Sequence, residues 1–369
     1  MSKIRAIAYY LPQFHPIPEN DEWWGKGFTE WTNVAKAKPL FRGHEQPKLP
    51  ADLGFYDLRV PEVREQQAQM AKDAGIEGFC YWHYWFGNGK KLLDRPFKEV
   101  LESGKPDFPF CLGWANESWS GIWHGAKDKI LIKQEYPGVH DYEAHFYDLL
   151  PAFNDKRYIR VDNKPLFLIY QPLNLPDINE FVEVFSRLAK QNGLNGIHFV
   201  ASNIGLKWDP RNAGFNALIY ASQENIMNHY APLRVKIRKK LKQFDMLTKF
   251  INLIDSKPLH VYTFEKAMQY FTVNKSFDFE FYHTIFSGWD NSPRSGKNGF
   301  ILTNFNPVVF RKHVNDVISK TIKTKNKIVF IKSWNEWAEG NYLEPDLKYG
   351  KSLLNVLKQE IEIGNSVIG

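Results

Sequence analysis

The sequence has 369 residues, of which 43% are hydrophobic and 24% are charged. This composition is typical of a folded globular protein and excludes a disordered, collagen-like or repeat architecture. Its 48 basic and 41 acidic residues give a formal net charge of +7. Because this excess is moderate and spread along the chain, we expect no nucleic-acid partner.

The two cysteines, Cys80 and Cys111, cannot form a disulfide framework and lack metal-site spacing. They therefore favour a reducing compartment. The first residues, MSKIRAIAYYLPQF, lack the regions of a signal peptide, and no run of eighteen apolar residues occurs. We expect a cytoplasmic protein.

Short apolar runs rich in β-branched and aromatic residues alternate along the chain with amphipathic stretches. This alternation is typical of βα units, in which helices join parallel strands. The predicted strands span residues 4–11, 78–82, 108–113, 165–170, 198–202, 217–221, 279–283 and 327–332. They predict an α/β protein of the (β/α)8 barrel type, folded as a single domain over residues 1–369.

Helices are predicted between these strands, where apolar residues recur about every 3.6 positions. Residues 61–74 are the clearest case, because Pro61 suits a first helical turn and Gly75 suits a C-terminal cap. Further helices are predicted over residues 140–154, 177–191, 307–322 and 352–363. The last of these would close the ring after the eighth strand.

Two long insertions, residues 12–59 and 225–257, are expected at the C-terminal rim of the barrel. The first is rich in Pro, Gly and Trp, which predicts an ordered loop held by its own aromatic packing. The second contains a basic run, residues 234–242, and predicts a basic helical hairpin. This run is either a solvated helical face or a contact with an anionic polymer or, peripherally, with a membrane surface.

Aromatic rings and polar groups gather where predicted strands end, which is where parallel barrels place their active sites. Four strands are followed by such mixed segments, at residues 9–15, 81–85, 114–117 and 334–340. A pyranose ring presents apolar C–H faces for stacking and hydroxyls for hydrogen bonds. The segments therefore favour an oligosaccharide or polysaccharide as the bound partner.

Glu336 and Glu339 are the candidate catalytic residues. Cleavage of a glycosidic bond needs two carboxylates, one as acid and one as nucleophile or base. The two glutamates stand three residues apart, so a turn would set them on one side. A glutamate beside an asparagine can instead cap a helix or pair with an arginine. We favour catalysis because Trp334 and Trp337 lie beside the pair, and Glu117 is a further candidate.

The residues expected to contact the sugar come from the four strand-end segments and from the first insertion. They are Tyr10, His15, Trp24, Glu30, Trp31, Trp82, His83, Tyr84, Trp85, Trp114, Asn116, Glu117, Trp334 and Asn335. We expect Trp24, Trp31, Trp85 and Trp114 to line an open groove. For His15 and His83, a buried, hydrogen-bonded role is an equal alternative.

Several common site motifs are missing from the sequence. No Gly-rich phosphate loop follows the first strand, no Gly-x-Ser-x-Gly segment occurs, and no histidines and carboxylates have metal-ligand spacing. We therefore expect no cofactor and no metal.

Six long strings carry a resemblance that extends over nearly the whole chain. They are AIAYYLPQFHPIPEN, WWGKGFTEWTNV, PADLGFYDLR, GFCYWHYWF, PFCLGWANESW and SWNEWAEGNYLEP. These strings resemble the WbsX family, which is labelled as glycosyltransferases of bacterial polysaccharide gene clusters. That family is related to glycoside hydrolase family 99, the endo-α-mannosidases.

The resemblance implies a (β/α)8 barrel that acts on α-linked oligosaccharide or polysaccharide. In family 99 the first glutamate of an Asn-Glu-Trp-x-Glu segment deprotonates the sugar 2-hydroxyl to form a 1,2-anhydro sugar, and the second is the acid/base. Carried to residues 335–339, this implies the first role for Glu336 and the second for Glu339. Ala338 departs from family 99, in which that position is commonly His.

Three functions compete: a retaining, endo-acting glycoside hydrolase, a glycosyltransferase of O-antigen or capsular polysaccharide synthesis, and a sugar-binding module without catalysis. A nucleotide-sugar transferase would ordinarily use a pyrophosphate-binding helix end or an Asp-x-Asp metal site, and the sequence contains neither. A silent module would not need the carboxylate pair. The hydrolase is therefore favoured.

Overall fold

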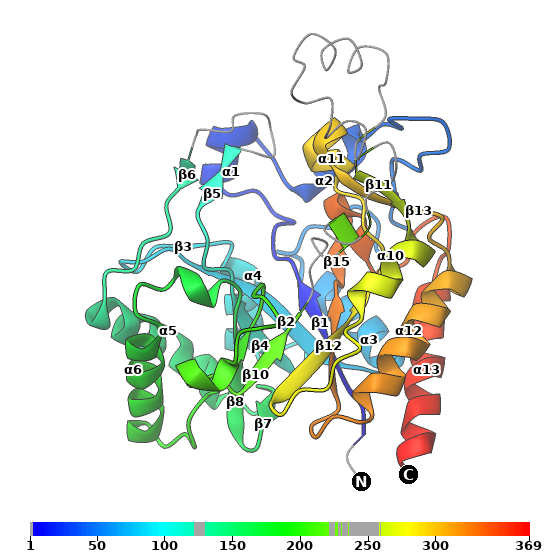
Figure 1. The fold of residues 1–369 in the computed structure, drawn as a ribbon. Coiled ribbons are helices and arrows are strands. Elements are labelled where there is room, and N and C mark those ends of the chain that lie inside the picture. The colour runs from blue at the N-terminus through cyan, green and yellow to red at the C-terminus, as the bar shows by residue number, and fades with distance from the viewer. Residues whose placement is uncertain are drawn as a thin grey trace.

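The computed structural model describes residues 3–121, 130–220, 226, 227, 230, 235, 258 and 260–369. Its barrel strands are β1 (Arg5–Tyr10), β2 (Ile76–Trp85), β4 (Phe110–Trp114), β8 (Lys164–Ile169), β9 (His198–Ala201), β10 (Ala217–Ile219), β12 (Glu280–Phe286) and β14 (Ile328–Lys332). They pair in parallel in the order β1, β14, β12, β10, β9, β8, β4 and β2, and β2 pairs back onto β1. The predicted (β/α)8 barrel is confirmed (Figure 1).

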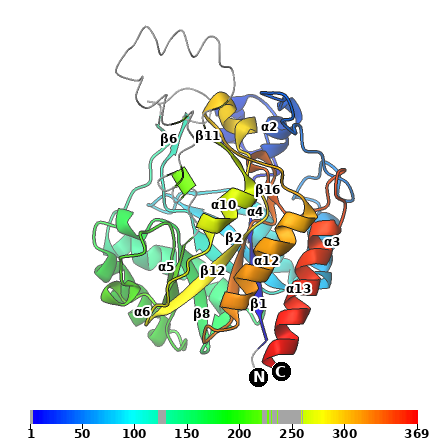
Figure 2. The same ribbon diagram turned by 45° about the vertical axis from the view of Figure 1, so that its right-hand side comes forward.

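Helices surround this barrel, and all five predicted ones are confirmed. They are α3 (Pro61–Asp73), α5 (Val139–Asn154), α6 (Ile178–Gln191), α12 (Pro307–Thr321) and α13 (Ser352–Ile368). The predicted set lacks α4 (Arg95–Ser103) and α10 (Phe264–Phe271). In Figure 2, α12 and α13 lie side by side on the outside of the barrel.

The sequence around α6 shows why such helices form and how they attach. The carboxylate of Asp177 caps the helix by accepting a hydrogen bond of 2.9 Å from the backbone N–H of Glu180. Phe181, Phe185 and Leu188 recur at helical spacing and are buried. This apolar face packs the helix onto the barrel.

Alternation along the strands decides which side chains enter the barrel. Tyr9 stacks on Trp82 inside it, with ring centroids 4.9 Å apart. Tyr10, the next residue of β1, instead donates a hydrogen bond of 2.7 Å to Gln67 of α3, outside the barrel. Successive side chains of a strand point to opposite faces, so Tyr9 points into the barrel and Tyr10 points out to the helices.

The first insertion contains two helices, α1 (Pro18–Trp24) and α2 (Glu30–Lys36), where a loop was expected. Its expected aromatic packing is present, since the Trp31 ring lies 4.8 Å from that of Phe14 and 5.5 Å from that of Trp337. In Figure 1, α1, α2 and the short helix α11 (Ser292–Ser295) gather at one end of the barrel, opposite the chain termini.

Short elements complete the described part of the chain. They are β3 (Lys91–Leu92), β5 (Trp119–Ser120), β6 (Ile130–Ile132), β7 (Arg160–Val161), β11 (His260–Thr263), β13 (Phe300–Thr303), β15 (Asn335–Glu336), β16 (Asn341–Tyr342), and the 3-10 helices η2 (Pro172–Asn174), η3 (Pro210–Ala213), η4 (Gly296–Asn298) and η5 (Trp337–Glu339).

The predicted basic helical hairpin of the second insertion, residues 225–257, lies almost wholly outside the described residues, and so does its basic run, residues 234–242. Among the helices that are described, none combines the length and hydrophobicity that crossing a membrane requires.

Candidate active site

A cavity of about 630 Å³ lies at the C-terminal ends of the barrel strands. The lining residues central to the site are Trp24, Glu30, Trp82, Tyr84, Glu117, Trp119, Tyr170, Trp289, Arg294, Lys332, Glu336 and Glu339. Aromatic rings from several loops thus surround a group of charged side chains. Aromatic rings together with a few charged groups are the combination expected of a sugar site.

Arg294 binds three carboxylates of this cavity. Its Nη1 lies 2.7 Å from Oε1 of Glu339, and its Nη2 lies 3.1 Å from Oε2 of Glu336. The Oε2 atom of Glu30 lies 3.0 Å from Nη2 and 3.2 Å from Nε. Arg294 belongs to α11, which follows β12, and Glu30 belongs to α2. One guanidinium therefore joins the first insertion and the loop after β12 to the two glutamates that follow β14.

Two local features set the two glutamates side by side. Glu336 ends β15 and Glu339 ends the single turn η5, so the turn brings both carboxylates to one guanidinium. The backbone N–H of Asp290 donates a hydrogen bond of 2.6 Å to the carbonyl of Glu339. The turn is therefore fixed to the loop after β12.

Burial, with repulsion from neighbouring carboxylates, raises the pKa values of three carboxyls of the cavity, Glu336, Glu30 and Glu117. Burial, with repulsion from Glu339, raises the pKa of Glu336 to about 8, although Arg294 opposes the shift. Burial raises the pKa of Glu30, and desolvation followed by repulsion from Glu339 raises that of Glu117. Near neutral pH, the pair formed by Glu336 and Glu339 therefore holds a proton.

Arg294 itself contacts one oxygen of each of the two glutamates. It contacts Oε1 of Glu339 and Oε2 of Glu336. Within the described part of the chain, no donor is bonded to Oε2 of Glu339 or Oε1 of Glu336. Both side chains line the cavity, so each carboxylate can exchange a proton with a bound molecule.

Seven of the residues singled out from the sequence line the cavity. They are Trp24, Glu30, Trp82, Tyr84, Glu117, Glu336 and Glu339. The structure thus brings the carboxylate pair together with aromatic residues of the first insertion and of β2. The other predicted substrate contacts lie elsewhere.

His83, Trp85 and Trp114 do not line the cavity, which corrects the expectation that they contact a sugar. They alternate with inward-pointing neighbours on β2 and β4, so they point outward to the helices. His83 Nε2 lies 2.9 Å from Nε2 of His145 on α5, and Trp85 stacks on the same imidazole at 4.7 Å. Trp114 donates a hydrogen bond of 2.9 Å to the carbonyl of Trp85.

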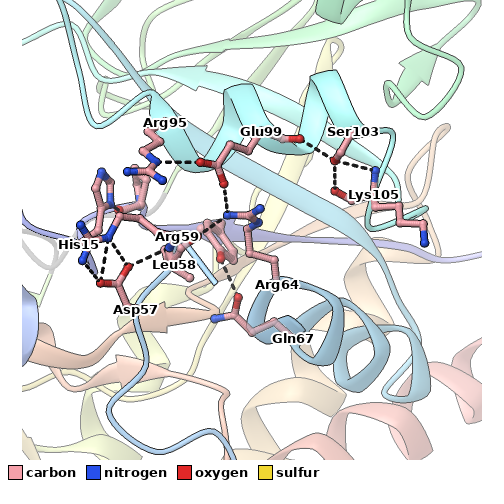
Figure 3. Close-up of polar contacts among 12 residues, drawn as sticks. His15, Asp57, Leu58, Arg59, Arg64, Gln67, Arg95, Glu99, Ser103 and Lys105 are labelled. Carbon is pink, nitrogen blue, oxygen red and sulfur yellow. Dashed lines mark hydrogen bonds and ion pairs between the residues drawn. The ribbon is translucent and has the colours of Figure 1, made fainter. Parts of the chain in front are cut away.

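Tyr10 and His15 are also buried away from the cavity, contrary to expectation. Tyr10 points to α3, and His15 lies 3.1 Å from the carbonyl of Pro12 through its Nδ1. Figure 3 shows His15 in a polar cluster with Asp57 and Arg59, beside the ion pair of Arg64 and Glu99 that joins α3 to α4. For His15 and His83 the alternative of a buried, hydrogen-bonded role is therefore the correct one.

Trp31 and Trp334 belong to the core rather than to the cavity wall. Trp31 donates a hydrogen bond of 2.7 Å to the carbonyl of Tyr56. Trp334 is fully buried, and its ring lies 5.2 Å from that of Phe79. Both support the loop that carries the carboxylate pair, without reaching the cavity.

Asn116 and Asn335 hold loops together rather than facing a ligand. The amide of Asn335 accepts from the N–H of Leu11 at 2.7 Å and donates to the carbonyl of Leu11 at 3.0 Å. Asn116 makes the same pair of bonds to Gln171, at 2.7 and 2.8 Å. Each amide thus joins the ends of two barrel strands.

Arg294, Lys332 and Trp289 line the cavity but were not among the predicted site residues. Their signal is present in the sequence: Trp289 and Arg294 follow the predicted strand at residues 279–283, and Lys332 ends the predicted strand at 327–332. The Nζ of Lys332 lies 4.6 Å from the Trp289 ring centroid. Among the described residues, no group of three or more His, Cys, Asp or Glu side chains forms a metal site.

Solved structures with this fold include glycoside hydrolases. An endo-α-mannosidase of glycoside hydrolase family 99 from Bacteroides thetaiotaomicron matches with a TM-score of 0.56 and 14% identity, over 99% of this chain and 100% of that chain. A glycoside hydrolase-like protein matches with a TM-score of 0.57 and 14% identity, over 98% of this chain and 94% of that one. At this identity the likeness is one of fold.

Sequence relatives are closer. The uncharacterized protein WxcX of Xanthomonas campestris pv. campestris, from strains ATCC 33913 and B100, is 37% identical over 362 residues, which are 96% of this chain. This chain spans about half the length of those relatives, 49% in each case. The family model described as glycosyltransferase WbsX matches residues 6–357. The chain therefore belongs to the WbsX family.

Proposed function

We propose that the protein is a retaining, endo-acting glycoside hydrolase that cleaves α-linked oligosaccharide or polysaccharide, with Glu336 and Glu339 as its catalytic pair. The observation that carries the proposal is the pair itself. Both carboxylates bind one guanidinium, and both line a cavity walled by aromatic rings. A glycosidase needs two carboxyl groups held close together on one side of the sugar.

The charges of the cavity favour an uncharged sugar chain over a sugar nucleotide. The lining residues that the structure describes include four carboxylates, Glu30, Glu117, Glu336 and Glu339, and two cations, Arg294 and Lys332. Arg294 is already bound to three of those carboxylates. A pyrophosphate would therefore be repelled, whereas a neutral sugar would stack on Trp24, Trp82 or Trp119.

The resemblance to family 99 supplies the proposed order of events. In the first half, ionised Glu336 takes the proton of the sugar 2-hydroxyl, and the 2-oxygen forms a bond to C1. The bond from C1 to the leaving oxygen breaks, and Glu339 gives its proton to that oxygen. The product of this half is a 1,2-anhydro sugar, with the proton now on Glu336.

In the second half, water attacks C1 and opens the anhydro ring. Glu339 takes a proton from the water, and Glu336 returns its proton to the 2-oxygen. Both carboxyls recover their starting forms. Because C1 is inverted twice, the product keeps the α configuration of the substrate.

Activity should fall as pH rises through about 8. Glu336 and Glu339 share one proton, which the pair loses with an apparent pKa of about 8. The productive form carries that proton on Glu339 while Glu336 is ionised. Above this pH both carboxyls are ionised and neither can protonate the leaving oxygen. We expect kcat/KM to decline about tenfold per pH unit on this limb. A profile that stays flat from pH 7 to pH 10 would contradict the assignment.

The function can be tested with a panel of α-linked manno-oligosaccharides and purified bacterial polysaccharides, each incubated with and without nucleotide sugars. We expect shorter oligosaccharides to appear without any nucleotide sugar, as internal cleavage requires. The description of the family favours a second candidate, a glycosyltransferase of O-antigen or capsular polysaccharide synthesis. Chain elongation that depends on a nucleotide sugar would support that candidate and reject hydrolysis.

A further inference from the structure

We propose that Arg294, anchored by Glu30, is a positioning residue that stabilises the ionised form of Glu336 and holds it beside Glu339 for proton exchange with the substrate. The inference rests on the proposed function, because it concerns how the pair of Glu336 and Glu339 is held in the arrangement and charge state that catalysis needs. It assigns a role to two residues outside the pair.

The guanidinium geometry carries the first step. Glu339 is bound through Nη1 at 2.7 Å, and Glu336 is bound through the other terminal nitrogen, Nη2, at 3.1 Å. A planar fork with two separate nitrogens can hold two carboxylates at once in a fixed arrangement. A lysine ammonium, which is a point charge, cannot impose the same arrangement.

Glu30 carries the second step, because it orients the fork. Its Oε2 accepts from Nε at 3.2 Å and lies 3.0 Å from Nη2, on the side of the guanidinium opposite Nη1. Glu30 is buried and stands in the first turn of α2, whose start is fixed by the capping box of Thr29 and Thr32. The first insertion thus fixes the arginine from outside the barrel.

The charges around the pair determine in which direction its pKa should shift when Arg294 or Glu30 is replaced. Besides burial, Glu339 and Glu30 raise the pKa of Glu336, and Arg294 and Lys332 lower it. Burial, followed by repulsion from Glu336, raises the pKa of Tyr84 on β2. Burial and repulsion from Glu339 raise the pKa of Glu117, and Lys332 lowers it. Among these groups Arg294 opposes protonation of Glu336, whereas Glu30 favours it. Loss of the arginine should therefore raise the pKa of the pair, and loss of Glu30 should lower it.

The test is a pH titration of the full chain by carbon-13 NMR, with glutamate labelled at its carboxyl carbon. The resonances of the pair are assigned by their disappearance in Glu336→Gln and Glu339→Gln. We expect a wild-type transition near pH 8. In Arg294→Met it should move up by about one pH unit or more, and in Glu30→Gln it should move down.

Arg157→Met is the matched control. Arg157 is also buried and bound to a carboxylate, Asp155, at 2.7 Å, but it precedes β8 at the other end of the barrel. We expect this variant to lose stability and to keep the wild-type transition. If Arg294→Met does not fold, Arg294→Lys tests the proposal instead, because it keeps the charge but loses the two-nitrogen fork, and its transition should also move up.

Three results would overturn the inference: a transition in Arg294→Met within about 0.3 pH unit of wild type, shifts of the same sign in Arg294→Met and Glu30→Gln, or ordinary titration of both wild-type carboxyls near pH 4. None of these measurements needs a substrate. Failure to cleave any glycan would instead reject the proposed function, with the titration result unaffected.

Discussion

Glu336→Gln and Glu339→Gln should each lower the rate of glycosidic cleavage by about 10²- to 10⁴-fold, the usual contribution of a general acid or base. The amide keeps the shape of the side chain but can neither accept nor deliver the required proton. Folding should survive, because Glu30 and the remaining glutamate still bind Arg294. Rates are measured as reducing ends released from an α-linked oligosaccharide, and folding is measured as the thermal midpoint.

Glu344→Gln is the control, because Glu344 is a buried carboxyl of the same segment that does not line the cavity. It accepts hydrogen bonds from Trp337 and Gln67 at 2.6 Å and from Tyr56 at 2.9 Å. An amide cannot accept all three, so we expect chiefly a lower thermal midpoint. Activity within about tenfold of wild type in Glu336→Gln or Glu339→Gln would remove that residue from the catalytic pair.

Trp114→Ala should lower the free energy of unfolding by about 3–5 kcal/mol, as expected for a fully buried tryptophan. Only 1% of Trp114 is exposed. Its ring packs 4.8 Å from His145 and 5.5 Å from Phe181, and its indole N–H is bonded to the carbonyl of Trp85. Denaturant unfolding of the variant and of wild type gives the difference.

Trp24→Ala is the contrasting variant, since Trp24 is half-buried and lines the cavity. We expect its free energy of unfolding to change by less than about 1 kcal/mol. Its binding of oligosaccharide should weaken by about 0.5–1.5 kcal/mol, measured by calorimetry on the Glu336→Gln background. The assignment of the two tryptophans fails if Trp114→Ala is stable and Trp24→Ala unfolds.

The barrel itself could be predicted because each strand is a buried apolar run, and buried runs that alternate with amphipathic helices are typical of this fold. The position of the carboxylate pair could be predicted for a related reason. Glu336 and Glu339 follow the last strand, and every strand of such a barrel ends at the same rim.

The aromatic residues that line the cavity are harder to predict from the sequence, because composition does not reveal which side chains of a strand point into the barrel. Trp82 and Tyr84 line the cavity, whereas His83 and Trp85, their neighbours in the same β2 run, pack on α5. Nothing in the string Tyr-Trp-His-Tyr-Trp separates the two sets. If the alternation is assumed to start one residue earlier or later, the residues that point into the barrel and those that point outward change places.

Arg294 illustrates a different limit. It lies 42 residues before Glu336, and its partner Glu30 lies 264 residues before it. Only the closed barrel brings the three segments together. The alternative considered for a glutamate at a strand end, pairing with an arginine, is also realised, and here it occurs within the candidate catalytic site.

The most direct test of the central claim is the anomeric form of the first product, followed by proton NMR during cleavage of an α-linked oligosaccharide. A retaining hydrolase with a 1,2-anhydro intermediate must release the α anomer first, with the β anomer appearing later by mutarotation. We expect that order for wild type and no release by Glu336→Gln. Initial release of the β anomer would contradict the retaining mechanism and the roles proposed for Glu336 and Glu339.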